Sequence, residues 1–155
     1  MTPLLAESPV ELQRRPISAS DAMCEAYYYA KPSAFSRGME VRLPGARMIF
    51  VSGTASVGPD GQSLHVGDFR RQTRQVFANA AQVLRSAGAD WRDVVKTTIF
   101  LKHMSRDYAA FNEERIAFFR DARVAPFPAS TCVEAGICRD ELLVEMELIA
   151  IVAAR

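Results

Sequence analysis

The hydrophobic positions of the chain fall into runs with two different periods, and these runs predict the elements of the fold. Residues 47–55 and 142–152 are apolar at most positions, which is typical of strands inside a sheet. Residues 34–43 alternate between apolar and polar side chains, as a strand with one buried face does. A Pro-Gly turn separates this segment from 47–55, so the two are expected to form a hairpin.

Two later segments repeat their apolar side chains every three to four residues, as amphipathic helices do. The first is expected to begin at Asp68, a favourable N-cap residue, and to end at Gly88, a favourable C-terminal residue. The second is expected to begin near residue 105. Residues 93–101 and 129–135 are rich in β-branched and small apolar side chains, and we expect them to be strands.

These elements give the order β-β-α-β-α-β-β, which indicates an α+β fold. Two helices can cover only one face of such a sheet, yet the strands carry large apolar residues on most positions. Another copy of the chain is therefore expected to cover the second face, which predicts a homo-oligomer. Residues 1–33 are interpreted as an N-terminal arm with a further short strand, and 34–155 as a single domain. Three consecutive tyrosines at 27–29 favour extended structure within the arm.

Composition and charge narrow the class of protein. The 155 residues suit one domain, and 49% hydrophobic and 24% charged residues are typical of a soluble globular protein. A formal net charge of +1 gives no electrostatic reason to expect nucleic-acid binding. No apolar run approaches the roughly 20 residues of a membrane span, and the N-terminus lacks the pattern of a signal peptide. Three cysteines without a disulfide pattern favour free thiols in the cytoplasm, and His65 and His103 lack the spacing of metal ligands.

The last strand carries two carboxylates within an apolar run. Glu145 and Glu147 occupy alternate positions and therefore share one face, while the apolar residues between and around them take the other. If another subunit covers the carboxylate face, Glu145 or Glu147 is a candidate acid or base. If the face is open to water, both are ordinary surface residues.

Several strings in the chain are similar to those of one known family. They are Val51-Ser52-Gly53, Gly67-Asp68 with Gln72, Gln75 and Asn79, the segments 87–90 and 93–101, Phe111-Asn112 before Phe118-Phe119, and 127–150. They resemble the reactive-intermediate deaminase family (RidA, also called YjgF) over most of the chain.

This resemblance implies a chorismate-mutase-like fold with a mixed sheet. It also implies a homotrimer with a central barrel and with small-molecule clefts between subunits. The activity that it implies is hydrolysis of enamines and imines without metal or organic cofactor.

The resemblance also suggests residues of the site. Glu145 corresponds to the glutamate that holds or activates the hydrolytic water in the family, and Ser52 and Gly53 correspond to a loop whose backbone lines the cleft. Phe35 stands where many members have tyrosine, and Cys132 corresponds to a common cysteine. All five are expected to contribute to substrate binding or, for Glu145, to acid–base catalysis.

One position departs from the family pattern. The family's Pro-Ala-Arg motif supplies an arginine that binds the substrate carboxylate, but this chain has Ser130 at that place. A serine hydroxyl does not replace the charge of a guanidinium. Arg37 is the best substitute, since it shares a strand face with inward-pointing apolar residues, and Arg139 is the second candidate. A surface or interface ion pair is the alternative role for each.

Other strings resemble the C-terminal half of chorismatases. They are 34–37, 52–56, 65–68, and 137–139 together with 142–145. In those enzymes a glutamate at the position of Glu145 protonates the substrate. Three functions are therefore open: hydrolysis of a pathway-specific enamine or imine, hydrolysis of a chorismate-type enol ether, and binding of a small molecule without catalysis.

Overall fold

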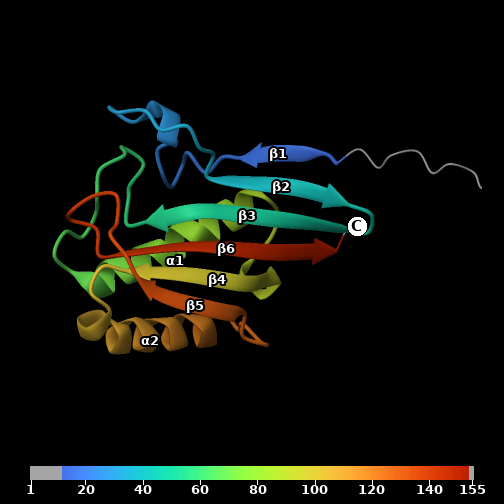
Figure 1. Ribbon diagram of the computed structural model, residues 1–155. Coiled ribbons are helices and arrows are strands. Elements are labelled where there is room, and N and C mark those ends of the chain that lie inside the picture. The colour runs from blue at the N-terminus through green and yellow to red at the C-terminus, as the bar shows by residue number, and fades with distance from the viewer. Residues whose placement is uncertain (1–11, 154–155) are drawn as a thin grey trace, which may run out of the picture.

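The computed structural model describes residues 12–153, which form a six-stranded sheet and two long helices (Figure 1). The strands are β1 (Arg14–Ile17), β2 (Gly38–Leu43), β3 (Ala46–Ala55), β4 (Val94–Leu101), β5 (Ala129–Glu134) and β6 (Val144–Ala153). The helices are α1 (Phe69–Ser86) and α2 (Met104–Asp121), with two short 3-10 helices, η1 (Ala26–Tyr28) and η2 (Trp91–Asp93). The predicted α+β class and order of elements are confirmed, with β1 as the further N-terminal strand.

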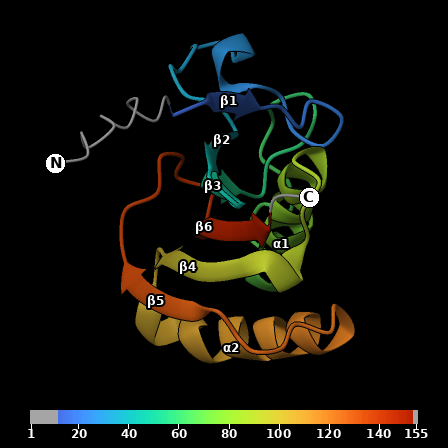
Figure 2. The same cartoon turned by 90° about the vertical axis from the view of Figure 1, so that its right-hand side faces the viewer.

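The sheet is mixed, and its strand order is β1-β2-β3-β6-β4-β5. All neighbouring strands run antiparallel except β4 and β5, which are parallel and joined through α2. Both long helices lie on one face of the sheet, as Figure 2 shows. In this part of the chain no helix has the length and apolar composition needed to cross a membrane.

The core lies between the sheet and the helices and is rich in aromatic rings. Phe77 of α1 packs with ring centroids 4.6 Å from Phe118 and 5.3 Å from Trp91. Alternate residues of β6 complete this core, because Val144, Met146 and Leu148 are buried. The predicted alternation of the last strand is therefore confirmed, and Glu145 and Glu147 lie on the opposite face of the sheet.

That opposite face carries a band of apolar side chains across the middle of the sheet. Met39 pairs with Phe50 and Phe50 with Ile149, so all three point the same way. Phe50 is 38% exposed and Ile151, on the same face of β6, is 44% exposed. The pattern of apolar strands predicts that another copy of the chain covers this band. The homotrimer stays a prediction.

Two local expectations for the N-terminal half are wrong. The tyrosines at 27–29 are not a strand, because the Tyr28 amide donates to the Glu25 carbonyl at 2.9 Å and closes a 3-10 turn around fully buried Ala26. The strand expected from residue 34 begins only at Gly38, opposite Val51. Before Gly38 the regular pairing with β3 is replaced by hydrogen bonds from Ser52, whose amide donates to the Arg37 carbonyl and whose hydroxyl donates to the Ser36 carbonyl.

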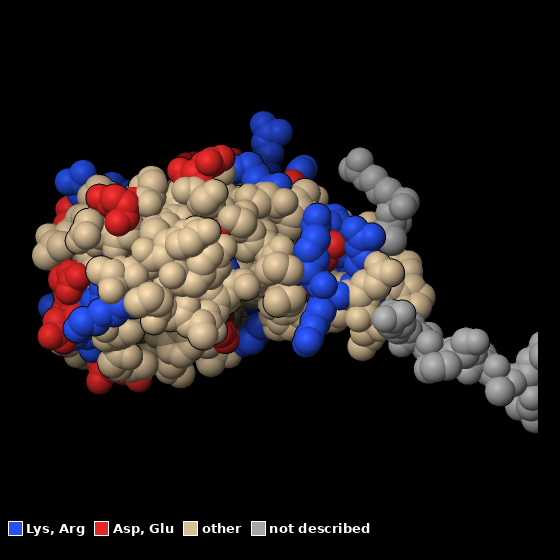
Figure 3. Space-filling view, turned by 90° about the horizontal axis from the view of Figure 1, so that it is seen from above, with Lys and Arg blue, Asp and Glu red and all other residues tan. Residues whose placement is uncertain are grey.

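A buried carboxylate joins the first three strands. Glu40 is 1% exposed and accepts hydrogen bonds from Arg47 at 2.7 Å, Arg42 at 3.1 Å and Arg15 at 3.3 Å. Burial opposes ionisation, but the hydrogen bonds from Arg42 and Arg47 and the nearby charges outweigh it and lower the pKa of Glu40. Figure 3, which views the molecule from the side of β1, shows basic side chains gathered on this surface.

Replacing Glu40 by glutamine is expected to lower the free energy of unfolding by about 1–3 kcal/mol at pH 7, because its three arginine partners lose the buried counter-charge that they share. The lower part of this range is favoured, since Arg15 and Arg42 are more than half exposed and solvent screens them. A lowered pKa stabilises the fold above the ordinary glutamate pKa of about 4.3, and this contribution is lost as the pH falls through the native value. Urea unfolding at pH 7 and pH 3.5 measures both effects. The wild type should be more stable than Glu40→Gln by a smaller amount at pH 3.5 than at pH 7. An equal difference in the free energy of unfolding at both pH values would contradict the lowered pKa of Glu40.

Candidate functional site

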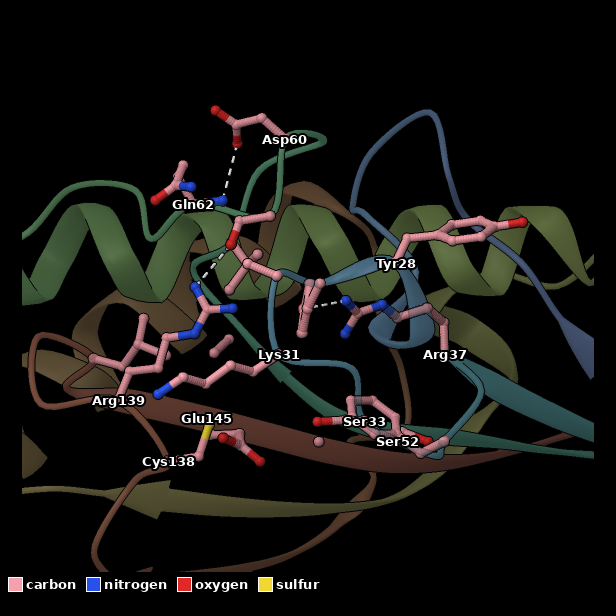
Figure 4. A pocket seen from close by; sticks show the side chains of 18 of the residues that line it. Tyr28, Lys31, Ser33, Arg37, Ser52, Asp60, Gln62, Cys138, Arg139 and Glu145 are labelled. Carbon is pink, nitrogen blue, oxygen red and sulfur yellow. Dashed lines mark hydrogen bonds between the residues drawn. The ribbon is translucent and has the colours of Figure 1, made fainter.

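A cavity of about 880 Å³ lies at the end of the sheet where β3 leaves it and β6 enters. Its walls come from residues 28–37 before β2, from residues 52–62 at and after the end of β3, and from the loop 138–142 before β6 (Figure 4). Glu145, at the start of β6, lies among these segments. The cavity therefore collects side chains from parts of the chain that are more than 100 residues apart.

Glu145 lies over a β-bulge in the neighbouring strand. The pairing of β3 with β6 shifts between Val51 and Thr54, so Ser52 and Gly53 form the bulge. A Cβ atom at position 53 would lie 2.1 Å from Oε1 of Glu145. The absence of a side chain at Gly53 is therefore what gives the Glu145 carboxylate its place against the backbone.

The environment of Glu145 favours its protonated form. Burial raises the pKa of this carboxyl, and the negative charge of Glu147 on the same strand face raises it further. Glu147 itself is exposed. A carboxyl with a raised pKa next to a cavity is a candidate to accept and donate a proton during a reaction.

Arg37 supplies a buried positive charge to the same cavity. The residue is 3% exposed, and its guanidinium donates to the carbonyl of Cys24 and to the hydroxyl of Tyr29. Its Cζ lies 5.3 Å from the ring centroid of Tyr29 and 5.4 Å from that of Phe35. A carbonyl, a hydroxyl and two aromatic rings therefore hold the Arg37 guanidinium. None of these groups is negatively charged, so none of them neutralises its charge.

Ser52 ties the bulge to the segment that carries these groups. Its hydroxyl donates to the carbonyl of Ser36 at 2.7 Å, and its amide donates to the carbonyl of Arg37 at 3.1 Å. Phe35, one residue earlier, is 40% exposed and lines the cavity. The bulge that makes room for Glu145 therefore also fixes the backbone from which Arg37 extends.

Arg139 approaches the cavity from the loop before β6. Its Nη1 donates to the carbonyl of Gly61 at 2.8 Å and to the hydroxyl of Ser63 at 3.2 Å. Its Cζ lies 5.0 Å from the ring centroid of Tyr29, the ring that Arg37 also contacts. The Ser63 hydroxyl in turn donates to Glu141 at 2.6 Å. Arg37 and Arg139, the two arginines proposed from the sequence to bind substrate, therefore both lie close to the Tyr29 ring.

Comparison with known sequences identifies the family. A family model described as endoribonuclease L-PSP matches residues 30–152. A RutC family protein of Pyrococcus abyssi is 36% identical over 102 residues, which cover 66% of this chain and 76% of the relative. The 3-aminoacrylate deaminase RutC of Acinetobacter baylyi is 32% identical over 103 residues, which cover 66% of this chain and 78% of the relative. The chain belongs to the RidA/YjgF family.

Solved structures of the RidA/YjgF family agree with the fold. The YjgF gene product of E. coli aligns with a TM-score of 0.71 and 30% identity, covering 91% of this chain and 99% of that one. E. coli TdcF with bound serine aligns with a TM-score of 0.73 and 25% identity, covering 90% and 99%. The two-helix, mixed-sheet architecture is therefore that of the family.

The match to the family model begins at residue 30, so part of the cavity wall comes from outside it. Cys24 and Tyr29, which hold the Arg37 guanidinium, both precede this point. Their segment is firmly attached, because Met23 and Ala26 are fully buried. The carboxyl of buried Glu25 also accepts hydrogen bonds from Ser18 and from the Ala19 amide.

Two predicted site residues lie away from this cavity. Ser130 and Cys132 are on β5, separated from β6 by β4, and they face α2 rather than the cavity. Arg115 of α2 donates to the Ser130 hydroxyl at 3.1 Å and also to Asn112. The position where the RidA/YjgF family has its arginine is therefore next to a guanidinium that comes from a helix. A role for Ser130 or Cys132 in binding substrate stays a prediction.

Sequence reasoning missed several residues that line the cavity. Lys31 and Gln62 come from turns, and Cys138 lies beside Glu145 (Figure 4). Burial raises the pKa of the Cys138 thiol, and the charge of Glu145 raises it further, so its nucleophilic thiolate is disfavoured. Turn residues carry no periodic signal, which is why their convergence was not visible in the sequence. Within residues 12–153, no three His, Cys, Asp or Glu side chains converge as metal ligands would.

Proposed function

We propose that this protein hydrolyses an enamine or imine to a carbonyl compound and ammonia, with Glu145 as the acid–base residue. The main support is the Glu145 carboxyl, which has a raised pKa and faces a cavity that also contains the buried Arg37 guanidinium. The family relationship adds to this, since one relative is named a 3-aminoacrylate deaminase. We further propose that the substrate belongs to one particular pathway.

The chemistry requires a group that both takes up and gives back a proton. In its ionised form Glu145 accepts a proton from water as the oxygen attacks the imine carbon. In its protonated form it donates to the nitrogen, which leaves as ammonia while the carbonyl forms. An enamine first takes a proton on carbon and becomes the iminium ion, which is the protonated form of the imine. A raised pKa makes the protonated form of Glu145 more accessible than that of an ordinary carboxyl, which favours a role as both proton donor and acceptor.

The other cavity residues suit the binding of an acidic substrate. Arg37 has no carboxylate within salt-bridge distance among the described residues, so it is available for a substrate carboxylate. Phe35 gives an apolar surface beside it. Ser52 and Gly53 bring backbone close to Glu145.

We also propose a homotrimer. The exposed apolar band of the sheet supports an interface, because water-exposed side chains such as Phe50 and Ile151 gain by burial against another copy. In such an assembly a neighbouring β5 with Ser130 and Cys132 would complete the site. A small molecule, without nucleic acid or membrane as a partner, is the proposed ligand.

An ammonia-release assay tests the proposed function. Imines are generated in situ by an amino-acid oxidase, and ammonia is followed with and without catalytic amounts of the protein. We expect the protein to accelerate release above the spontaneous rate. Unchanged rates across imines of small, branched and acidic amino acids would contradict the proposal. Chorismate consumption followed in the ultraviolet tests the chorismatase-like alternative, and ligand binding without turnover would indicate a non-catalytic protein.

A further inference from the structure

Two arginines of the cavity have no carboxylate within salt-bridge distance among the described residues. Arg37 is bound by the Cys24 carbonyl and the Tyr29 hydroxyl, and Arg139 by the Gly61 carbonyl and the Ser63 hydroxyl. A buried charge without a counter-charge is unfavourable. Arg37, at 3% exposure, is such a charge, and the most direct way to compensate it is an anion in the cavity.

The two guanidiniums are placed so that one small ligand can reach both. Each Cζ lies close to the same ring centroid, at 5.3 Å for Arg37 and 5.0 Å for Arg139, so the two Cζ atoms are no farther apart than the sum of these distances. The two side chains extend toward each other from opposite sides of the cavity, and Glu145 lies below them (Figure 4). Both guanidiniums keep donor groups that no described residue uses.

We infer that the cavity selects a substrate with two acidic groups, one for each arginine, such as the imine of a dicarboxylic amino acid. The inference rests on the proposed function for the reaction, but the ligand class follows from the two arginines alone. A monocarboxylate can occupy one guanidinium and leaves the other without a ligand carboxylate. A dicarboxylate of matching length satisfies both and gains a second charge-assisted hydrogen bond.

Binding of unreactive acids tests the ligand class without turnover. Titration calorimetry compares succinate, glutarate and adipate with butyrate and valerate on the intact protein. We expect at least one dicarboxylate to bind about 10- to 100-fold more tightly than the monocarboxylates. Arg139→Gln should remove this preference. Arg120→Gln, which changes a 75% exposed arginine of α2 far along the chain from the cavity, should retain it.

Turnover then separates this inference from the proposed function. Imines from D-aspartate and D-glutamate, made by an acidic D-amino-acid oxidase, are compared with the imine from alanine. Arg139→Gln should lower the ratio of kcat/KM for the acidic imines to kcat/KM for the alanine imine by about 10-fold or more. Equal binding of mono- and dicarboxylates, or a preference that survives in both Arg139→Gln and Arg37→Gln, overturns the inference. Tight dicarboxylate binding without ammonia release from any imine overturns the proposed function and leaves the inference intact.

Discussion

Glu145→Gln is expected to lower kcat/KM for ammonia release by about 100- to 10,000-fold, the range over which a positioned acid–base residue contributes. Glutamine keeps the shape and some hydrogen bonding of the side chain but neither accepts nor donates a proton at neutral pH. The measurement is a comparison of steady-state ammonia release by the variant and the wild type on the best substrate of the panel. Wild-type activity in the variant would exclude Glu145 as the acid–base residue.

Stability and pH provide the control for this variant. Because the native pKa of Glu145 is raised, the folded protein favours its neutral form, and that contribution is present at low pH and lost as the pH rises through the native value. At pH 7 the neutral glutamine should therefore leave the melting temperature unchanged or higher.

Glu147→Gln removes a negative charge that raises the Glu145 pKa, so it should move the bend of the pH–rate profile to lower pH. A bend that stays in place would assign it to another group.

Gly53→Ala is expected to reduce kcat/KM by about 100-fold, because displacement of a catalytic group by about 1 Å has effects of this size. The added Cβ would lie 2.1 Å from Oε1 of Glu145, so the carboxylate must move away from the bulge. The clashing atom is the end of a flexible side chain, and the backbone of Gly53 is outside the left-handed region. The melting temperature should therefore change little while the activity falls.

Gly136→Ala is the matched control for this substitution. A Cβ at position 136 would have no atom within 4 Å among its described surroundings, so activity and melting temperature should both stay close to wild type. Thermal unfolding and ammonia release on the same preparations separate the two effects. Full activity in Gly53→Ala would show that the position of Glu145 against the bulge does not matter for catalysis.

Periodic signals in the sequence predicted most of the fold. The last strand alternates as expected, because Val144 and Met146 are buried while Glu147 is exposed. The N-cap of α1 was also predicted, since the Asp68 carboxylate accepts from the Arg71 amide at 3.0 Å. Glu40 could not be predicted as a buried carboxylate, because its partner Arg47 comes from a different strand and only the folded sheet brings them together.

The candidate site was predicted in part. Phe35, Arg37, Arg139 and Glu145 line one cavity, as do Ser52 and Gly53. The contact of Tyr29 with both arginines could not be predicted, because it depends on a 3-10 turn where extended structure was expected. Ser130 and Cys132 were inferred from family resemblance and lie outside this cavity, so the structure of the single chain does not test their role.

The segment before residue 30 gives the cavity a consequence for evolution. Cys24 and Tyr29, which hold the Arg37 guanidinium, precede the stretch that matches the family model, whereas Arg37, Glu145 and the bulge lie within it. Substitutions at residues 24 and 29 can therefore alter the surroundings of Arg37 during evolution while Glu145 and its bulge stay unchanged.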